Sequence, residues 1–235
     1  MDNHTLINSL KNKLSAYNIQ YHDVKNSVTI EISKNDLIPI CKTLKSESSL
    51  KFNMLIDICA VDYLTYGDAD WKTLDATNTG FSRAVKKTII PDPDENYDEK
   101  RFGIFYQLLS LDHNMRLSIS TYTGSTNPPT IDSIHGIWNA SDWFEREAFD
   151  LMGIQFKGHP DLRRILTDYG FKGHPLRKDF PLTGHTEVRY SEDKKKVISE
   201  PVKLDQEYRV FDFESPWEGT KYIKKETEKN KTEKK

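Results

Sequence analysis

The spacing of apolar residues predicts two amphipathic helices near the beginning of the chain. Residues 4–16 place Ile7, Leu10 and Leu14 on one helical face. A second helical pattern runs from residue 36 to residue 45, and an Asn-Asp pair favours its start. Each helix is therefore expected to bury one side and to expose the other.

Other apolar patterns predict strands. Val28, Ile30 and Ile32 alternate with polar residues, as in a strand with one buried face. Residues 52–61 are nearly all apolar and predict a central strand, although the length of this run is also compatible with a buried helix. Residues 101–122 contain two β-like runs joined by an Asp-His-Asn turn, which predicts a hairpin.

The following segment predicts two more helices. The sequence STNPPT breaks the sheet, and Thr130 can cap a helix that carries four apolar residues, Ile131, Ile134, Ile137 and Trp138. Ser141 is expected to cap the next helix, and Gly153 is expected to end it. Helix and strand patterns thus alternate irregularly up to about residue 152.

These elements predict an α+β fold for residues 1–152, in which a mainly antiparallel sheet has helices packed on one face. Residues 64–100 are expected to interrupt this domain as an acidic surface loop. Between Asp62 and Glu99 the chain carries nine acidic and four basic side chains. A loop of this length indicates either function or mobility.

Residues 153–220 lack any helical period and predict a long extended C-terminal arm. They contain six Gly and five Pro, yet also nine aromatic residues: Phe156, Tyr169, Phe171, Phe180, Tyr190, Tyr208, Phe211, Phe213 and Trp217. Aromatic residues with arginine are typical of interface anchors, so we expect the arm to wrap around a partner. The alternative is a loop-rich second subdomain with its own small core. Residues 221–235 predict a disordered, charged tail.

The helix after Ser141 combines apolar and charged residues unusually. Arg146, Glu147 and Asp150 are expected to point away from the apolar face. Glu145 falls within that face, and a buried carboxylate needs a cation or hydrogen-bond donors. The nearest cations in sequence are Arg163-Arg164. Alternatively, Glu145 lies at the margin of the face and reaches water. The apolar arc consists of Phe144, Ala148, Leu151 and Met152, with Phe149 at its edge.

Composition excludes several classes of function. The chain has 34 Lys and Arg against 36 Asp and Glu, so no global basic field indicates binding to nucleic acid or to an anionic membrane. No run of about 18 apolar residues predicts a membrane span. Residues 1–14 lack the features of a secretory signal or transit peptide, so we expect the protein to act in the compartment where it is made.

Two cysteines limit the metal chemistry of the chain. Iron–sulfur clusters and structural zinc sites built on cysteine normally use four ligands, and only Cys41 and Cys59 are present. Both lie in apolar patterns, so we expect two small buried side chains. Their thiols are expected to be free in a reducing cytoplasm.

The densest pattern begins at Trp143, ends at Tyr190 and resembles a known family. The residues that carry the resemblance are Glu145-Arg146-Glu147, Asp150-Leu151, Gly153-Ile154, Phe156, Gly158-His159-Pro160, Arg163-Arg164-Ile165-Leu166, Thr167-Asp168-Tyr169-Gly170 and Gly173-His174-Pro175-Leu176-Arg177-Lys178-Asp179-Phe180-Pro181-Leu182. They resemble the signature of the C subunit of the proton-pumping NADH:quinone oxidoreductase, which is the thirty-kilodalton subunit of respiratory complex I. Residues 101–122 and, more loosely, 210–219 are also similar. Residues 80–83 resemble an insertion of some bacterial members, which favours a bacterial origin.

The resemblance implies a subunit of an enzyme that passes electrons from NADH to quinone and couples this transfer to proton translocation. Family members bind no cofactor and supply no catalytic residue; FMN, iron–sulfur clusters and quinone belong to partner subunits. The implied partners are the quinone-site subunit of the hydrogenase large-subunit lineage and other subunits of the peripheral arm. The implied location is the cytoplasmic face of the bacterial inner membrane, or the matrix face in mitochondria, with membrane association only through the complex.

The paired charges of this run are expected to contact the partner, because bidentate arginine–carboxylate contacts fix orientation as well as adding affinity. The expected interface residues are Glu145, Arg146, Glu147, Asp150, His159, Arg163, Arg164, Asp168, His174, Arg177, Asp179 and Trp217.

Two rival functions stay open. His159 and His174, together with nearby carboxylates, could serve a metal-dependent hydrolase, but their spacing matches no helical ligand pair and both precede proline in turn sequences. The equivalent subunit of a membrane-bound hydrogenase complex shares the same ancestry. The long run of residues 173–182 favours the quinone-reducing complex by analogy. The paired arginines are flanked by Asp161 and Asp168, which argues against a nucleic-acid patch.

Overall fold

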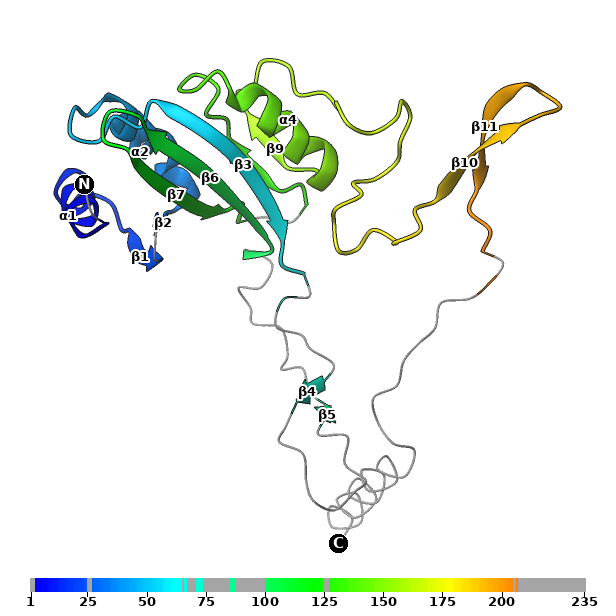
Figure 1. Ribbon diagram of the computed structural model, residues 1–235, viewed down its shortest axis with the longest axis horizontal. Helices are drawn as coiled ribbons and strands as arrows, with labels where there is room; N and C mark the ends of the chain where they lie inside the picture. The colour runs from blue at the N-terminus through cyan, green and yellow to red at the C-terminus, as the bar shows by residue number, and fades with distance from the viewer. Residues whose placement is uncertain are drawn as a thin grey trace, which may run out of the picture. The chain divides into compact units, whose positions relative to one another are not determined.

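The computed structural model describes residues 3–24, 27–64, 66, 71–73, 85–87, 100–124, 127–204 and 206 (Figure 1). The chain divides into two compact units, one made of Met1–Leu64 and Glu95–His185 and the other of Thr65–Asp94 and Thr186–Lys235. Trp217, the end of the expected arm and the expected tail lie outside the described residues.

A five-stranded sheet is the framework of the first unit. Its strand order is β1 (Gln20–Val24), β2 (Ser27–Glu31), β7 (Met115–Tyr122), β6 (Phe102–Ser110) and β3 (Met54–Asp62). Strands β2 and β7 are parallel, and the other neighbours are antiparallel. The predicted α+β class with a mainly antiparallel sheet is confirmed. Apolar spacing did not predict β1, whose residues are mostly polar.

Two helices cover one face of this sheet. Helix α1 (Asn3–Lys13) buries Leu6 and Leu10, and α2 (Leu37–Ser46) follows the short 3-10 turn η1 (Lys34–Asp36). Their buried side chains join the alternate apolar residues of the strands in a single core cluster. This arrangement satisfies the apolar stripe of each helix and one face of the sheet together.

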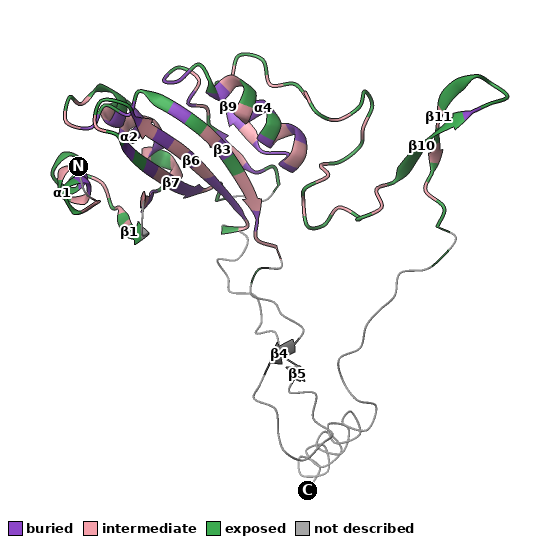
Figure 2. Cartoon of the chain, viewed as in Figure 1, coloured by how far each residue is buried: buried purple, intermediate pink, exposed green. Residues whose placement is uncertain are grey.

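Strand β3 lies at the edge of the sheet, so the prediction of a central strand is wrong. Among the described strands it pairs with β6 alone, and exposed and buried residues alternate along it (Figure 2). Met54 is 45% exposed and Ile56 is 39% exposed. Cys59 is exposed as well, which corrects the expectation that both cysteines are buried, whereas Cys41 is buried as predicted. The outward face of β3 is apolar in sequence but is left open by the described residues.

The helix expected after Thr130 is not formed. Residues Thr130–Asp132 form β8, which pairs in parallel with β9 (Gln155–Lys157). Ile134 then accepts backbone hydrogen bonds from Ile137 and Trp138 in a single turn. The four apolar side chains are all buried, so their spacing reflects burial by a strand and a turn rather than a continuous helix.

Helix α4 (Ser141–Met152) lies against β3 and covers the edge of the sheet (Figure 1). Its N-cap is Ala140, which makes no side-chain cap, so the predicted cap by Ser141 is wrong. Gly153 ends the helix in the left-handed conformation, with φ of 77°, as predicted. A Cβ at this glycine would approach the His174 ring to 2.7 Å, which is a second reason for glycine here.

Among its described residues, the second unit contains two short antiparallel strand pairs. Strands β4 (Trp71–Thr73) and β5 (Val85–Lys87) are antiparallel and fall within the expected acidic loop. Strands β10 (Thr186–Ser191) and β11 (Lys196–Pro201) form the second antiparallel pair. None of the helices in the described part of the chain is both long and apolar enough to cross a membrane.

Candidate functional site

Glu145 lies on the inner side of α4 and is 0% exposed. Its Oε1 accepts a hydrogen bond from the backbone N–H of Ile134 (2.8 Å), and its Oε2 accepts one from the Ser133 hydroxyl (2.6 Å). The prediction that this carboxylate finds donors is therefore confirmed, while the alternative of a water-exposed margin and the expected pairing with Arg163-Arg164 are wrong. Burial raises the pKa of Glu145 to about 7, although both hydrogen bonds oppose the shift.

The opposite side of α4, where Arg146 and Asp150 were expected, is also covered by the chain. Both are buried. The Arg146 guanidinium donates through Nε to the backbone oxygen of Arg163 (3.2 Å) and lies 5.1 Å from the Trp143 ring centroid. The segment after α4, around Arg163, therefore packs back onto the polar side of the helix. Helical periodicity describes only the spacing within a helix, so it could not predict this contact.

The first Gly-His-Pro turn is fixed to the beginning of α4 by His159, whose side chain is fully buried. The backbone N–H of Asp161 donates to His159 Nδ1 (3.1 Å), and Nε2 lies 3.3 Å from the backbone oxygen of Asp142. Because Nδ1 accepts, the ring hydrogen is on Nε2 and points to Asp142. Nε2 also lies 3.9 Å from Glu145 Oε2, so this turn and the buried carboxylate form one cluster.

Asp150 organises the next segment through its side-chain carboxylate, which is 0% exposed. Oδ2 accepts three consecutive backbone N–H groups, from Ile165 (3.1 Å), Leu166 (2.8 Å) and Thr167 (2.9 Å). Oδ1 accepts the Thr167 hydroxyl (2.6 Å) and Arg164 Nη1 (3.0 Å). Burial alone would raise the pKa of Asp150, but the hydrogen bonds outweigh it and lower the pKa to about 2.

The second Gly-His-Pro turn caps the end of α4. The last carbonyl groups of a helix lack partners within the helix. Here the backbone oxygen of Asp150 lies 2.9 Å from His174 Nδ1, and that of Leu151 accepts the backbone N–H of Leu176 (3.1 Å). Arg164 adds a further tie, because its Nη2 donates to the backbone oxygen of Gly173 (2.8 Å). The two turns therefore hold residues 158–176 against both ends of one helix.

Asp62, at the end of β3, is another buried carboxylate. It accepts two hydrogen bonds from the Arg101 guanidinium (3.0 and 3.2 Å) and one each from the N–H groups of Leu64 (3.0 Å) and Lys178 (2.9 Å). Burial tends to raise the pKa of Asp62, but these donors lower it below its usual value. Arg101 also binds Asp179 at 2.7 Å, which joins the later segment to the sheet.

A ring and a backbone hydrogen bond complete this junction. The guanidinium carbons of Arg101 and Arg177 lie 4.8 and 5.0 Å from the Phe102 ring centroid. The backbone N–H of Tyr63 donates to the backbone oxygen of Arg101 (2.8 Å). The chain therefore leaves the sheet after Asp62 and re-enters it at Phe102, and the contacts of the junction hold these two ends together.

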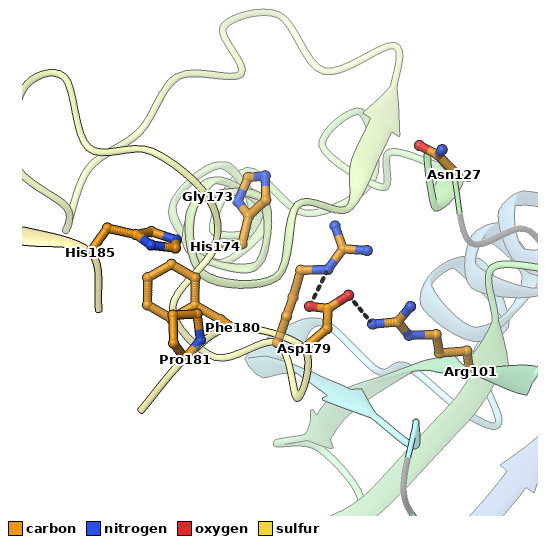
Figure 3. A pocket seen from close by; sticks show the side chains of 9 residues that line it. Arg101, Asn127, Gly173, His174, Asp179, Phe180, Pro181 and His185 are labelled. Carbon is orange, nitrogen blue, oxygen red and sulfur yellow. Dashed lines mark hydrogen bonds and ion pairs between the residues drawn. The ribbon is translucent and has the colours of Figure 1, made fainter. Parts of the chain in front are cut away.

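A cleft of about 450 Å³ opens beside the junction, and Figure 3 shows Asp179 in contact with Arg101 at its wall. The two arginines of the junction are matched by two carboxylates, Asp62 and Asp179. The cleft therefore gains no net charge from them. Its lining residues are Arg101, Asn127, Gly173, His174, Arg177, Asp179, Phe180, Pro181 and His185.

Most of the predicted interface residues thus contact other parts of the same unit. Glu145 and His159 form one cluster, Asp150 and Arg164 a second, and Asp179 joins Arg101 and Arg177 in a third. Glu147, Arg163 and Asp168 are exposed, and Arg163 pairs with Asp161 at 2.8 Å. His174 and Arg177 are half-buried. Trp217 lies outside the described residues.

Sequence reasoning missed four residues that build these clusters. Asp62 and Arg101 carried a usable signal, since an acidic residue at the end of an apolar strand and an arginine at the beginning of a hairpin need partners. Ser133 carried none, because single hydroxyl residues are common in loops, and Thr167 was marked only as part of the family motif. Within the described residues, no group of three or more His, Cys, Asp and Glu side chains is placed to hold a metal ion.

Comparisons with known proteins agree with the pattern of the site. The family model described as respiratory-chain NADH dehydrogenase, 30 Kd subunit, matches residues 30–186. The NADH-quinone oxidoreductase C subunit of Hydrogenovibrio crunogenus is 49% identical over 190 residues, which cover 80% of this chain and 84% of the relative. The C subunit of Coxiella burnetii is 44% identical over 204 residues, which cover 85% of this chain and 87% of the relative.

A solved structure supports the fold alone. A chain of the membrane-bound sulfane sulfur reductase, an archaeal respiratory membrane complex, aligns with a TM-score of 0.53 at 15% identity and covers 83% of this chain and 98% of that chain. The family assignment rests on the sequence matches, which span most of the chain and include every described cluster of the site. The resemblance inferred from residues 143–190 is therefore confirmed, and the chain belongs to the family of the 30-kilodalton subunit of the respiratory-chain NADH dehydrogenase.

Proposed function

We propose that this chain is a structural subunit, without a redox centre of its own, in the peripheral arm of an NADH:quinone oxidoreductase. In that complex, electrons pass from NADH through FMN and iron–sulfur clusters in other subunits to quinone, and the transfer is coupled to proton translocation. The chain holds the quinone-site subunit of the hydrogenase large-subunit lineage and its neighbours in position. It works at the cytoplasmic face of the bacterial inner membrane and is attached to the membrane only through the complex.

The observation that carries this proposal is the buried carboxylate of Asp150. It fixes three consecutive backbone N–H groups, a hydroxyl and a guanidinium in a segment that has no regular secondary structure. A loop fixed from within loses little conformational freedom when a partner binds it. The same segment leaves Leu166, Tyr169 and Leu176 exposed on its outer side. A stiff loop with exposed apolar residues is suited to positioning a neighbour.

The expected interface residues fall into a buried group and an exposed group, and we propose a different role for each. Glu145, Asp150 and His159 are buried and shape the segment from inside. Glu147 and Arg163 are exposed and are available for direct contact with a partner. In this proposal the buried group controls assembly through the shape of the loop, and the exposed group controls affinity at the surface.

The test uses two adjacent arginines. Arg164 is 29% exposed and bound to Asp150, whereas Arg163 is 70% exposed and bound to Asp161. Loss of one partner from a buried pair costs about 3 kcal/mol or more, and loss of an exposed pair costs less than about 1 kcal/mol. Arg164→Ala is therefore expected to lower the amount of assembled complex in membranes at least about tenfold. Arg163→Ala is expected to lower it far less.

The readouts are native gels of gently solubilised membranes stained for NADH-dye activity, together with quinone reduction per assembled complex. The expected result is that turnover per complex stays within about twofold in both variants, since neither change touches reacting atoms. Normal assembly of Arg164→Ala with slow turnover would give these residues a role in quinone chemistry or proton coupling and would contradict the structural role. Absence of the chain from the active band would overturn the proposal as a whole.

A further inference from the structure

The outward face of β3 is more apolar than an edge strand of this sheet requires. A nearly continuous apolar run such as residues 52–61 is typical of a strand that is covered on both faces. The described residues cover one face: Leu55 and Ile58 are buried in the core, while Met54, Ile56 and Cys59 are exposed. The composition of the strand therefore indicates a cover that the described part of the chain does not supply.

Most apolar residues of the open face lie on two strands, β3 and β6. On β6, Phe105 lies opposite Cys59 and Leu109 lies opposite Met54. The next strand presents Ser120 and Arg116 opposite these same two residues. On the same face, Gln107 lies between the two apolar residues of β6, and Tyr122 lies opposite Gly103 at the end of β7. The face is therefore mainly apolar on β3 and β6 and mainly polar on β7. We call the mainly apolar part the open strip, and its apolar residues are Met54, Ile56, Cys59, Val61, Phe105 and Leu109.

A bulge widens the open strip beside α4. The register of β3 shifts between Leu55 and Asp57, so the extra residue Ile56 has no opposite partner on β6. Bulges at sheet edges commonly redirect a side chain toward a functional surface. Here the bulge turns a large apolar side chain outward. Asp57, which follows it, is half-buried and places a carboxylate within the strip.

The strip is bordered by an exposed part of α4 that is both apolar and acidic. Trp143 is 62% exposed, and Glu147, four residues later on the same side of the helix, is also exposed. Burial raises the pKa of Cys59 to about 11, and the nearby carboxylates of Asp57 and Glu147 act in the same direction. Asp57 accepts hydrogen bonds from the backbone N–H of Ile58 and from the Cys59 thiol, and both donors are neutral. The strip therefore combines apolar side chains with two carboxylates that form no ion pair with any described residue.

We infer that the open strip is a second contact surface, covered in the assembled enzyme by an apolar segment of another subunit that carries a lysine or arginine beside Glu147 and Asp57. This inference rests on the proposed role in a multisubunit complex. Charge argues for a partner, and not the chain's own residues 62–99, as the cover of the strip. Residues 62–99 hold nine acidic and four basic side chains, so they would be repelled by Asp57 and Glu147.

The native cysteines provide a direct test in the full chain and in the complex. Cys59 is exposed on the strip, and Cys41 is buried and serves as an internal control that stays unlabelled until the protein is denatured. We expect a maleimide to label Cys59 at least about tenfold more slowly in the purified complex than in the isolated chain. In a Cys59→Ser background, Thr29→Cys on the polar half of the same face is expected to be labelled at similar rates in both forms.

The outcomes separate this inference from the proposed function. If the chain is present in the active complex and Cys59 is labelled as fast as in the isolated chain, the strip is not a contact surface. Equal protection of Thr29→Cys would mean that shielding is general, which also overturns the assignment to the strip. Protection of Cys59 already in the isolated chain, relieved by removal of residues 70–95, would identify the acidic segment as the occupant instead.

Charge and shape are then tested by substitution. Ile56→Asp is expected to reduce incorporation into the complex at least about tenfold, because it replaces an apolar contact at the centre of the strip with a charged side chain that must be desolvated. Glu147→Lys is expected to reduce incorporation more than Glu147→Gln, because it places a cation against the partner's cation. Asn8→Asp, exposed on α1, is the matched control for Ile56→Asp. Unchanged incorporation of Ile56→Asp, with unfolding of the isolated chain also unchanged, would refute the proposed cover.

Discussion

Residues 158–185 and the hairpin of β10 and β11 are neighbouring parts of the expected C-terminal arm, yet they are held by different forces. The first segment has no helix or strand, and the carboxylates of Asp150 and Asp62 bind its backbone at residues 165–167 and 178. The hairpin is regular, but Val188, Tyr190 and Val197 are exposed on one side of it. Regular backbone hydrogen bonding and burial of the side chains are therefore independent properties.

The difference follows from burial of the polar contacts. A buried carboxylate that loses its donors cannot turn to water, so its hydrogen bonds hold the segment firmly. The ion pair of the hairpin, Arg189 with Glu200 at 3.0 Å, is exposed on both sides and is screened by solvent. An isolated two-stranded hairpin is at best marginally stable in water. We therefore expect residues 158–185 to keep their shape in the free chain and the hairpin to open readily.

The largest expected effect comes from removal of the Asp150 carboxylate. Asp150→Ala leaves three backbone N–H groups and the Arg164 guanidinium without their acceptor, and we expect it to lower the free energy of unfolding by about 3 to 5 kcal/mol. Asp150→Asn keeps one carbonyl oxygen and is expected to cost less. Urea unfolding of the isolated chain measures both. Equal stability of Asp150→Ala and wild type would remove the proposed difference between the two regions.

The second effect is a pH dependence of stability that arises from the buried carboxyl group of Glu145. The pKa of Glu145 is about 7 in the fold against 4.5 unperturbed, so the folded state holds the proton more strongly. The stabilisation is then complete below pH 4.5 and is lost as the pH rises through 7. Relative to wild type, Glu145→Gln should gain about 3 kcal/mol between pH 4 and pH 8. Urea unfolding at both pH values tests this, with Glu147→Gln as the exposed control that should show no such gain.

Trypsin tests the comparison between the two regions directly. Both contain basic residues, with Arg163, Arg164 and Arg177 in the first segment and Arg189 and Lys194 in the hairpin. We expect cleavage of the free chain in the hairpin to be at least about tenfold faster, because it requires only local opening. Mass spectrometry of timed digests gives the order of cuts. In Asp150→Ala the difference should shrink, and an early cut at Arg164 in wild type would contradict the comparison.

The smallest expected effect is that of the exposed ion pair. Glu200→Gln removes the charge opposite Arg189 but leaves the tryptic sites in place. We expect the rate of cleavage at Lys194 to change by less than about twofold, because exposed ion pairs add little to stability. The same timed digests measure it. A large acceleration would show that the hairpin depends on this pair and resembles the first segment more closely than its exposure indicates.

Local apolar spacing predicted the elements that bury one side and expose the other, because their apolar residues recur with a regular period. Helices α1 and α2, strand β2 and the hairpin of β6 and β7 each show a clear period and occur where expected. The placement of β3 could not be predicted in this way, because the neighbours of a strand and the cover of its faces are tertiary properties. The supposed helix after Thr130 failed for a related reason: a strand and a single turn buried the same apolar residues.

The candidate site was predictable in composition but not in geometry. The motif of residues 143–190 identified the family and drew attention to Glu145, Asp150 and the two Gly-His-Pro turns. Helical spacing suggested that Glu145 would need donors, but the donors include a backbone N–H, which every residue except proline possesses. The three backbone N–H groups that donate to Asp150 could not be predicted from the sequence for the same reason. Whether the expected interface residues contact a partner stays a prediction.

The junction of Tyr63 with Arg101 has a consequence for how the family can vary. The chain leaves and re-enters the sheet where a backbone hydrogen bond and the Asp62–Arg101 pair already hold the two ends together. Doubling the length of a flexible connection adds only about 0.6 kcal/mol of closure entropy. Insertions and deletions between residues 64 and 100 should therefore be tolerated far better than in any strand of the sheet. The same property makes this position suitable for grafting a purification tag or a fluorescent domain without disturbing the core.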